Sequence, residues 1–136
     1  MDDVEAIKQL KARYFRTMDT KDWSAMRRLF TDDVVMDTTE SGGGVVMGAD
    51  VFMAFLQQAL AEALTVHHGH MPEITLTSPT TATGIWALHD EIEWPDGTRM
   101  QGDGHYHETY ELVAGEWRIA SSTLTRLRMD LAGPAS

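Results

Sequence analysis

Three of the six histidines in this chain lie close together in the sequence, at His67, His68 and His70. Imidazole titrates near neutral pH, so a histidine can take up and return a proton under physiological conditions. Asp19 is a second candidate, because a carboxylate at the end of a predicted helix meets the negative end of the helix dipole and needs a compensating partner. A solvated loop aspartate is the alternative interpretation. Together, these side chains suit general acid–base chemistry.

Another carboxylate, Asp90, falls within a long predicted strand from Thr80 to Trp94. Alternation along that strand places Asp90 on the same face as Trp86 and other large apolar side chains. A carboxylate in such surroundings needs a charged or hydrogen-bonding partner, and this makes Asp90 a candidate site residue. A β-bulge that shifted the register would turn it to solvent instead.

The histidines also raise the question of a metal. His68 and His70 are near His67, and His105 and His107 share one strand face, which would suit zinc. No helical His-x-x-x-His pattern or carboxylate triad accompanies them, so we interpret these four as solvated or packing residues. We expect no metal and no cofactor.

Three helices are predicted to position the candidate residues. Apolar residues recur at helical spacing over residues 4–18, over residues 23–30 and over residues 51–63. Between the second and third helices, a hairpin is predicted from strands at 34–36 and 45–47 around a turn at 41–44.

After His70 the pattern changes to strand alternation. Long strands are predicted over residues 80–94, 100–113 and 117–128, joined by tight turns. Helices followed by a long antiparallel meander indicate an α+β domain whose helices cover one face of a curved sheet. We expect a single domain over residues 1–130 and a disordered tail over residues 131–136.

The composition limits the possible partners. A formal net charge of −10 would repel phosphate backbones and anionic lipid surfaces, so neither nucleic acid nor a membrane is an expected partner. The acidic N-terminus lacks the features of a signal peptide, and no apolar run approaches the roughly 20 residues of a membrane span. We therefore expect a cytoplasmic protein.

The order of elements, the run from Trp23 into Thr31-Asp32-Asp33-Val34, and the segments 104–106 and 115–119 resemble the SnoaL-like branch of the nuclear transport factor 2 superfamily. This resemblance implies a cone-shaped α+β barrel, in which three N-terminal helices pack on a strongly curved, mixed but mostly antiparallel sheet around a deep apolar pocket. The chain is similar to the Asp/His group of that superfamily, which includes bile acid 7α-dehydratase, scytalone dehydratase and hexachlorocyclohexane dehydrochlorinase.

In that group an aspartate after the first helix pairs with a histidine after the third, and the matching positions here are Asp19 and His67. The resemblance implies that His67 is the base, that Asp19 orients it, and that Tyr14 hydrogen-bonds an oxygen of the substrate. Asp90 matches a pocket aspartate of the bile acid dehydratase. A core residue with its hydroxyl at the surface is the alternative for Tyr14.

The implied pocket also needs residues that contact the substrate. We expect this role for Trp86, Tyr106 and Phe55. Relatives carry a pocket arginine near the end of the chain, where both Arg126 and Arg128 stand; we favour Arg128, and surface charges are the alternative for both.

These features favour a cofactor-independent lyase or isomerase of the dehydratase kind, acting on a small, apolar, cyclic substrate. One alternative is a protein of the same fold that only binds a small ligand or serves as a scaffold. Another is an enzyme similar to ketosteroid isomerases or polyketide cyclases with Asp90 as the base. A curved sheet with one open face in so small a chain also predicts a homo-oligomer, a dimer or a trimer.

Overall fold

The computed structural model of the chain describes residues 1–134. Its three helices, one 3₁₀ turn and six strands follow in the order α1 (Asp3–Asp19), α2 (Trp23–Arg27), β1 (Phe30–Asp37), η1 (Thr39–Ser41), β2 (Val45–Met47), α3 (Ala49–Leu60), β3 (Leu64–Ser78), β4 (Thr81–Glu93), β5 (Arg99–Val113) and β6 (Glu116–Ala132). Within these described residues, no helix has the length and apolar character needed to span a membrane.

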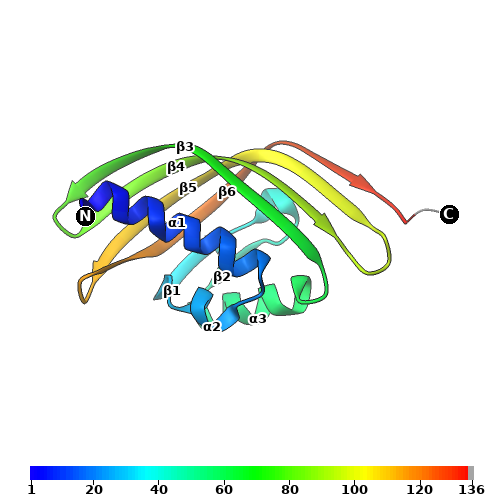
Figure 1. The fold of residues 1–136 in the computed structure, drawn as a ribbon, viewed down its shortest axis with the longest axis horizontal. Helices are drawn as coiled ribbons and strands as arrows, with labels where there is room; N and C mark the ends of the chain where they lie inside the picture. The colour runs from blue at the N-terminus through cyan, green and yellow to red at the C-terminus, as the bar shows by residue number, and fades with distance from the viewer. Residues whose placement is uncertain (135–136) are drawn as a thin grey trace.

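All six strands belong to one mixed sheet with the order β2-β1-β6-β5-β4-β3. Every neighbouring pair is antiparallel except β1 and β6, which run parallel. Figure 1 shows the four long strands arching over the helices. The predicted α+β class and curved, mostly antiparallel sheet are confirmed, and the sheet stays open at its edges, β2 and β3.

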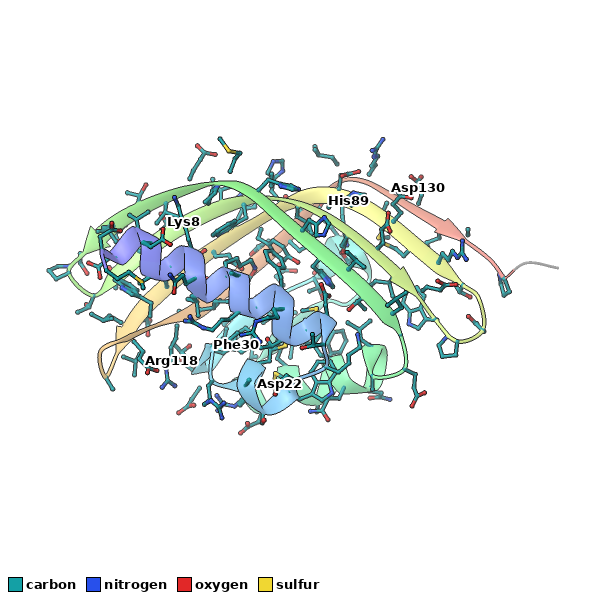
Figure 2. All side chains as sticks on the ribbon, viewed as in Figure 1. Lys8, Asp22, Phe30, His89, Arg118 and Asp130 are labelled. Atoms are coloured by element: carbon teal, nitrogen blue, oxygen red, sulfur yellow. The ribbon has the colours of Figure 1, made fainter. Side chains whose placement is uncertain are left out.

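The helices cover only the inner, concave side of the sheet (Figure 1). Helix α1 begins where the Asp2 carboxylate accepts a hydrogen bond from the backbone N–H of Glu5 at 2.8 Å, a typical N-cap. Its apolar residues recur every three or four positions, so one stripe faces the sheet. The resulting core contains Ile7, Leu10 and Phe30, all at most 1% exposed. Side chains fill the space between this helix and the strands (Figure 2).

Several boundaries differ from the predictions. Helix α2 ends at Arg27, and Phe30 begins strand β1 instead of ending the helix, because it pairs with Ile119 of β6. Strand β3 begins at Leu64 and therefore includes the histidine stretch that we expected to precede the strands. Strand β6 continues to Ala132, so residues 131 and 132 belong to the sheet and not to a tail. Residues 135 and 136 of the predicted tail lie outside the described part.

One irregularity in β6 decides which of its side chains face inward. Gly104 pairs with Arg126, whereas the preceding residue, Asp103, pairs with Arg128. Leu127 is therefore an extra residue in β6, a β-bulge, and it reverses the alternation of the strand. Arg126 and Arg128, two positions apart, consequently lie on opposite faces of the sheet.

Candidate active site

A cavity of about 250 Å³ lies between the concave face of the sheet, the C-terminal part of α1, helix α3 and the β1–β2 hairpin. Its walls are mostly apolar. Four side chains that could take part in acid–base chemistry line it together, and they come from three strands and one helix: Tyr14, His67, Asp90 and Arg126. Such a cavity, apolar with a few convergent polar groups, is typical of small-molecule sites.

Asp19 and His67 are directly hydrogen-bonded. Nδ1 of His67 lies 2.7 Å from Oδ1 of Asp19, and the backbone N–H of His67 donates to Oδ2 of Asp19 at 2.9 Å. Asp19 is the last residue of α1, and His67 is the fourth residue of β3, whose edge packs against this helix. The side chain of His67 is 6% exposed and that of Asp19 23%.

Asp19 is held in place despite its unfavourable position at the C-terminal end of a helix. Besides His67, the hydroxyl of Thr65 donates to Oδ1 at 2.9 Å, and Lys21 Nζ donates in turn to the Thr65 hydroxyl at 3.0 Å. Burial opposes ionisation of Asp19, but the hydrogen bonds from His67 and Thr65 outweigh it and hold the pKa of Asp19 below its ordinary value. Asp19 is therefore an anion at neutral pH.

An anionic Asp19 fixes the tautomer of a neutral His67. The carboxylate can only accept, so Nδ1 carries the hydrogen and Nε2 presents its lone pair. Nε2 lies on the other side of the ring, 4.0 Å from Oδ2 of Asp90, which also lines the cavity. The ring of Phe15 lies nearly parallel to the imidazole, with 6.4 Å between centroids. This geometry can present Nε2 as a base and stabilise the imidazolium after proton transfer.

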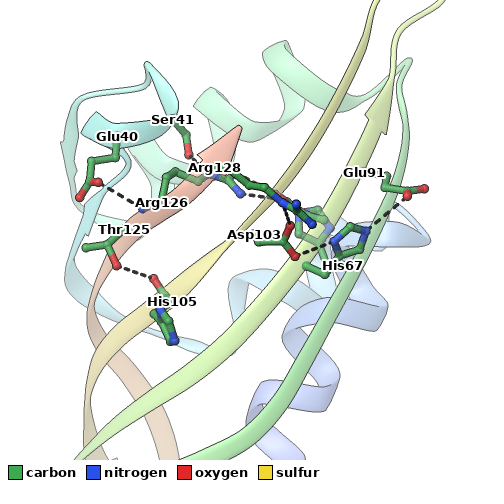
Figure 3. Close-up of polar contacts among 11 residues, drawn as sticks. Glu40, Ser41, His67, Glu91, Asp103, His105, Thr125, Arg126 and Arg128 are labelled. Carbon is green, nitrogen blue, oxygen red and sulfur yellow. Dashed lines mark hydrogen bonds and ion pairs between the residues drawn. The ribbon is translucent and has the colours of Figure 1, made fainter. Parts of the chain in front are cut away.

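Asp90 has the partner that its buried position requires. Its side chain is 3% exposed and forms a bidentate pair with Arg126, Nη1 to Oδ1 at 2.6 Å and Nη2 to Oδ2 at 2.9 Å. Arg126 also reaches the β1–β2 hairpin, where its Nε donates to the hydroxyl of Ser41 at 2.9 Å and its backbone N–H to Glu40 at 3.2 Å (Figure 3). Arg126 thus connects the hairpin over the cavity to Asp90 on β4.

Tyr14 and Tyr106 place two phenols on the cavity wall. Their rings meet edge to face with centroids 5.9 Å apart, and both residues are 3% exposed. Burial, together with the Glu108 carboxylate, raises the pKa of Tyr14 far above its ordinary value, and burial likewise raises the pKa of Tyr106. Both hydroxyls therefore stay protonated and can donate hydrogen bonds. Phe55, as expected, also lines the cavity.

Two of the residues predicted to contact substrate lie elsewhere. Arg128 faces the outer side of the sheet, where its Nε pairs with Asp103 at 2.6 Å and its side chain is 69% exposed. The β-bulge at Leu127 turns it there, so Arg126 is the arginine that lines the cavity. Trp86 is on the inner face but does not line the cavity, and its indole N–H donates to the Tyr110 hydroxyl at 2.9 Å.

The other histidines lie away from the cavity. His89 is on the outer side of the sheet, where it pairs with Asp103 and Glu91 (Figure 2). The pairs His68–His70 and His105–His107 have ring centroids 6.3 and 6.4 Å apart. Over residues 1–134, no three histidine or carboxylate side chains come close enough together to hold a metal ion.

Sequence reasoning missed Thr65, Phe15 and Lys21 as the immediate surroundings of the Asp19–His67 pair. No pattern distinguishes these residues from ordinary helix and strand positions. It also missed Lys11, a fully buried lysine whose position in α1, four residues after Ile7, falls on the apolar stripe. A charged residue on that stripe was a signal that could have been followed.

Comparison with known proteins agrees with this architecture. A protein from Gibberella zeae, named "Probable cyclase FGR4", is 25% identical over 92% of this chain and 91% of its own length. The crystal structure of an aromatic ring hydroxylase candidate from Novosphingobium aromaticivorans superposes with a TM-score of 0.87 at 22% identity, covering 98% of this chain and 96% of that one. A scytalone dehydratase candidate from the same organism gives 0.84 at 18% identity, over 98% and 93%.

The two structural neighbours share too little sequence to indicate more than a common fold. The sequence signature of the SnoaL-like domain, however, matches residues 1–123, nearly the whole chain. With its helices on the concave face of one open, curved sheet, this chain belongs to the SnoaL-like domain family.

Proposed function

We propose that this protein is a lyase or isomerase that works without a cofactor on a small, apolar, cyclic substrate. The observation that carries the proposal is the 2.7 Å hydrogen bond between Asp19 and His67 Nδ1, which leaves Nε2 available as a base beside an apolar cavity. In the proposed reaction, Nε2 removes a proton from a carbon next to a carbonyl group. The electrons of the broken C–H bond move to the carbonyl oxygen and form an enolate.

The surrounding residues would stabilise this step. The imidazolium formed on His67 lies between the carboxylates of Asp19, at 2.7 Å, and Asp90, at 4.0 Å. The phenol of Tyr14 donates a hydrogen bond to the enolate oxygen, as in an oxyanion hole. The enolate then has three possible fates, each of which uses the proton held on His67. It loses a β-hydroxyl group, which takes that proton and leaves as water; it takes the proton at another carbon; or it adds to a second carbonyl, whose oxygen takes the proton. The mostly apolar lining of the cavity would strengthen these electrostatic contacts.

The relatives are consistent with enolate chemistry. A dehydratase eliminates water after the proton is lost, and a cyclase can close a ring by adding an enolate to a carbonyl carbon. The names of the Gibberella relative and of the scytalone dehydratase candidate therefore fit two reactions that both begin with enolate formation and differ in the later steps.

Asp90 is a weaker candidate for the base. Both of its oxygens already accept hydrogen bonds from Arg126, whereas Nε2 of His67 has no hydrogen-bond donor beside it among residues 1–134. The variants Asp90→Asn and His67→Ala separate the two assignments, since each removes one base and leaves the other.

The decisive experiment measures deuterium exchange by NMR in D₂O, using a panel of cyclic ketones such as cyclohexanone and 2-tetralone. Exchange next to the carbonyl reports proton abstraction whatever the enolate does afterwards. We expect the wild-type protein to accelerate exchange in at least one ketone and His67→Ala to lose roughly 10²- to 10⁴-fold of that rate.

His89→Ala is the matched control, because His89 also pairs through Nδ1 with an aspartate, Asp103 at 2.9 Å, but on the outer side of the sheet. Its exchange rate should equal that of the wild type. If the panel binds in the cavity and no ketone exchanges, the protein is a ligand-binding member of the family. Exchange that survives in His67→Ala and disappears in Asp90→Asn would assign the base to Asp90.

A further inference from the structure

Behind the cavity wall, Lys11 of α1 and Glu108 of β5 form an ion pair that is completely buried. Lys11 Nζ lies 2.8 Å from Oε2 of Glu108, and both side chains are 0% exposed. Glu108 also accepts hydrogen bonds from the hydroxyls of Ser122 and Tyr110, each at 2.8 Å. Three donors thus converge on one carboxylate. Lys11 supplies the only amine among these three donors, and the other two are hydroxyl groups.

A buried ion pair needs an explanation other than stability. Removing two charges from water is unfavourable, and apolar residues of similar volume often stabilise a protein equally well or better. Burial accordingly lowers the pKa of Lys11, and the nearby Glu108 carboxylate opposes that shift. The position of the ammonium group indicates what the pair does.

The ammonium group of Lys11 lies between the two phenols of the cavity. Nζ is 3.7 Å from the centroid of the Tyr14 ring and 3.6 Å from that of the Tyr106 ring. Both rings contribute to the cavity wall, whereas Lys11 does not touch the cavity. A cation on the face of an aromatic ring attracts its π electrons, and this attraction is stronger where water is excluded. The cation–π attraction becomes stronger when the phenol donates a hydrogen bond to an anion, because negative charge then spreads into the ring.

We propose that Lys11 and Glu108 are positioning residues for the enolate-forming reaction. Glu108 holds the Lys11 ammonium group against the rings of Tyr14 and Tyr106. The ammonium group keeps both phenols in place and strengthens Tyr14 as a hydrogen-bond donor to an oxyanion in the cavity. This inference rests on the proposed function. Lys11 acts through the phenols and never contacts the substrate. The ligands that respond to it are anions with the charge on an oxygen of a flat ring, such as enolates and phenolates.

The test uses 4-nitrophenol, whose anion is coloured and resembles a cyclic enolate. Its binding to the full-length protein is followed by absorbance at neutral and alkaline pH. The variant pair Lys11→Met with Glu108→Gln removes both charges together, so neither ion is left unpaired. We expect this double variant to bind the 4-nitrophenolate anion about tenfold more weakly than the wild type, in line with a desolvated cation–π contact.

The matched control is Arg99→Met with Glu93→Gln, which removes an exposed ion pair of 3.1 Å between the neighbouring strands β4 and β5. Its affinity for the anion should be that of the wild type. A second control repeats Lys11→Met with Glu108→Gln in a Tyr14→Phe background. If Lys11 acts through the Tyr14 hydroxyl, the double variant should weaken anion binding by less than about twofold in the Tyr14→Phe background. The hydroxyl on which Lys11 acts is already missing from that background. A purely structural role would weaken binding equally in both backgrounds.

A measurement on the wild-type protein covers the case in which the double variant does not fold. The chain has only three tyrosines, so ¹³Cζ-tyrosine labelling gives three NMR signals that Phe substitutions assign. Binding of 4-nitrophenolate should shift the Tyr14 signal and, in ¹⁵N-lysine-labelled protein, the Nζ signal of Lys11. A shift at Tyr14 with none at Lys11, or unchanged affinity in the double variant, would overturn the inference.

These outcomes are distinct from failure of the proposed function. If Tyr14→Phe binds the anion as tightly as the wild type, Tyr14 is no oxyanion donor and the proposed function loses that role. If Tyr14→Phe weakens binding and the double variant does not, the proposed function stands without Lys11.

Discussion

The salt bridge between Asp90 and Arg126 shows how a buried charge constrains its surroundings. Both side chains are at most 6% exposed, and the two contacts at 2.6 and 2.9 Å satisfy both carboxylate oxygens. Removing only one partner of such a pair leaves an uncompensated charge in the interior. A substitution of either residue alone is therefore expected to change stability, which has to be measured beside any change in activity.

We expect Arg126→Met to lower the free energy of unfolding by about 3–5 kcal/mol, because Asp90 is left buried without a partner. Arg128→Met is the control, since it removes an arginine two positions away whose side chain is 69% exposed, and should change stability by less than about 1 kcal/mol. Urea denaturation followed by tryptophan fluorescence measures both. Equal losses in the two variants would contradict the buried bidentate pair.

Asp19 makes the stability of the site depend on pH. Hydrogen bonds hold the pKa of Asp19 in the folded protein below the ordinary value of 3.8, which applies to the unfolded chain. The folded state therefore favours the carboxylate, and the resulting stability is present above the unfolded pKa and lost as pH falls through the lower folded pKa.

We expect Asp19→Asn to lower the free energy of unfolding at neutral pH by about 1–3 kcal/mol, because the hydrogen bonds from His67 and Thr65 lose their charged acceptor. The difference from the wild type should shrink in acid, where wild-type Asp19 is also neutral. Urea denaturation of both proteins across the acid range measures it. A difference that stays constant down to the lowest pH would mean that Asp19 is not ionised through these contacts.

At the scale of elements, a glycine in β5 makes room for the salt bridge. Gly102 lies opposite Asp90 on β4, and a Cβ atom there would overlap Nη1 of Arg126 and lie 3.1 Å from Oδ1 of Asp90. The bulge in β6 at Leu127 turns Arg126 toward the same place. Gly102 of β5 thus leaves the space for the guanidinium, and the bulge in β6 directs Arg126 into that space.

Gly102→Ala should therefore displace the Arg126 guanidinium and cost about 1–3 kcal/mol of stability, the usual range for overpacking. Gly133→Ala is the matched control, since a methyl group added at Gly133 would have no neighbouring atom within 4 Å. Thermal unfolding measures stability, and 4-nitrophenol binding measures the cavity. A Gly102→Ala protein with unchanged stability and binding would show that Arg126 can move without consequence.

At the scale of the whole molecule, the three helices cover only the concave side of the sheet (Figure 1). The convex side carries polar and histidine side chains and, at the bulge, Leu127 with 76% of its surface exposed. Strand β3, at the opposite end of the sheet from β2, has no further strand beside it in the described part of the chain, although part of it packs against α1. Exposed edges and open sheet faces are commonly covered by a second copy of the same chain.

We expect a homodimer or homotrimer, and sedimentation velocity at micromolar concentration will measure its mass. Leu127→Asp should weaken association if the convex face forms the contact. Val45→Asp, which changes a residue 57% exposed on the short strand β2, serves as its control. A wild-type protein that sediments only as a monomer would contradict the expectation.

Much of this structure was predictable because it depends on local patterns. Helical spacing in α1 and α3, and alternation in β4 and β5, follow from the repeat of each element, and they led to the α+β class and to the inward position of Asp90. The resemblance to the SnoaL-like family then indicated Asp19 and His67 as partners. In the structure these two residues are hydrogen-bonded, although nothing near either one in the sequence specifies the other.

Other features depended on contacts between distant segments. The end of α2 before Phe30 depends on pairing with Ile119, and the length of β6 depends on pairing with β5. The bulge at Leu127 exchanges the roles of Arg126 and Arg128 because one extra residue reverses the alternation of a strand. Burial of Lys11 depends on Glu108, which is 97 residues away.

The sequence alone determined the type of each long element and the chemical groups available to a site, since periodicity and composition are properties of the chain itself. Only the tertiary structure decided which of those groups meet. A hydrogen bond or a buried charge requires two atoms within about 3 Å of each other, and side-chain direction changes completely with a shift of one residue in strand register.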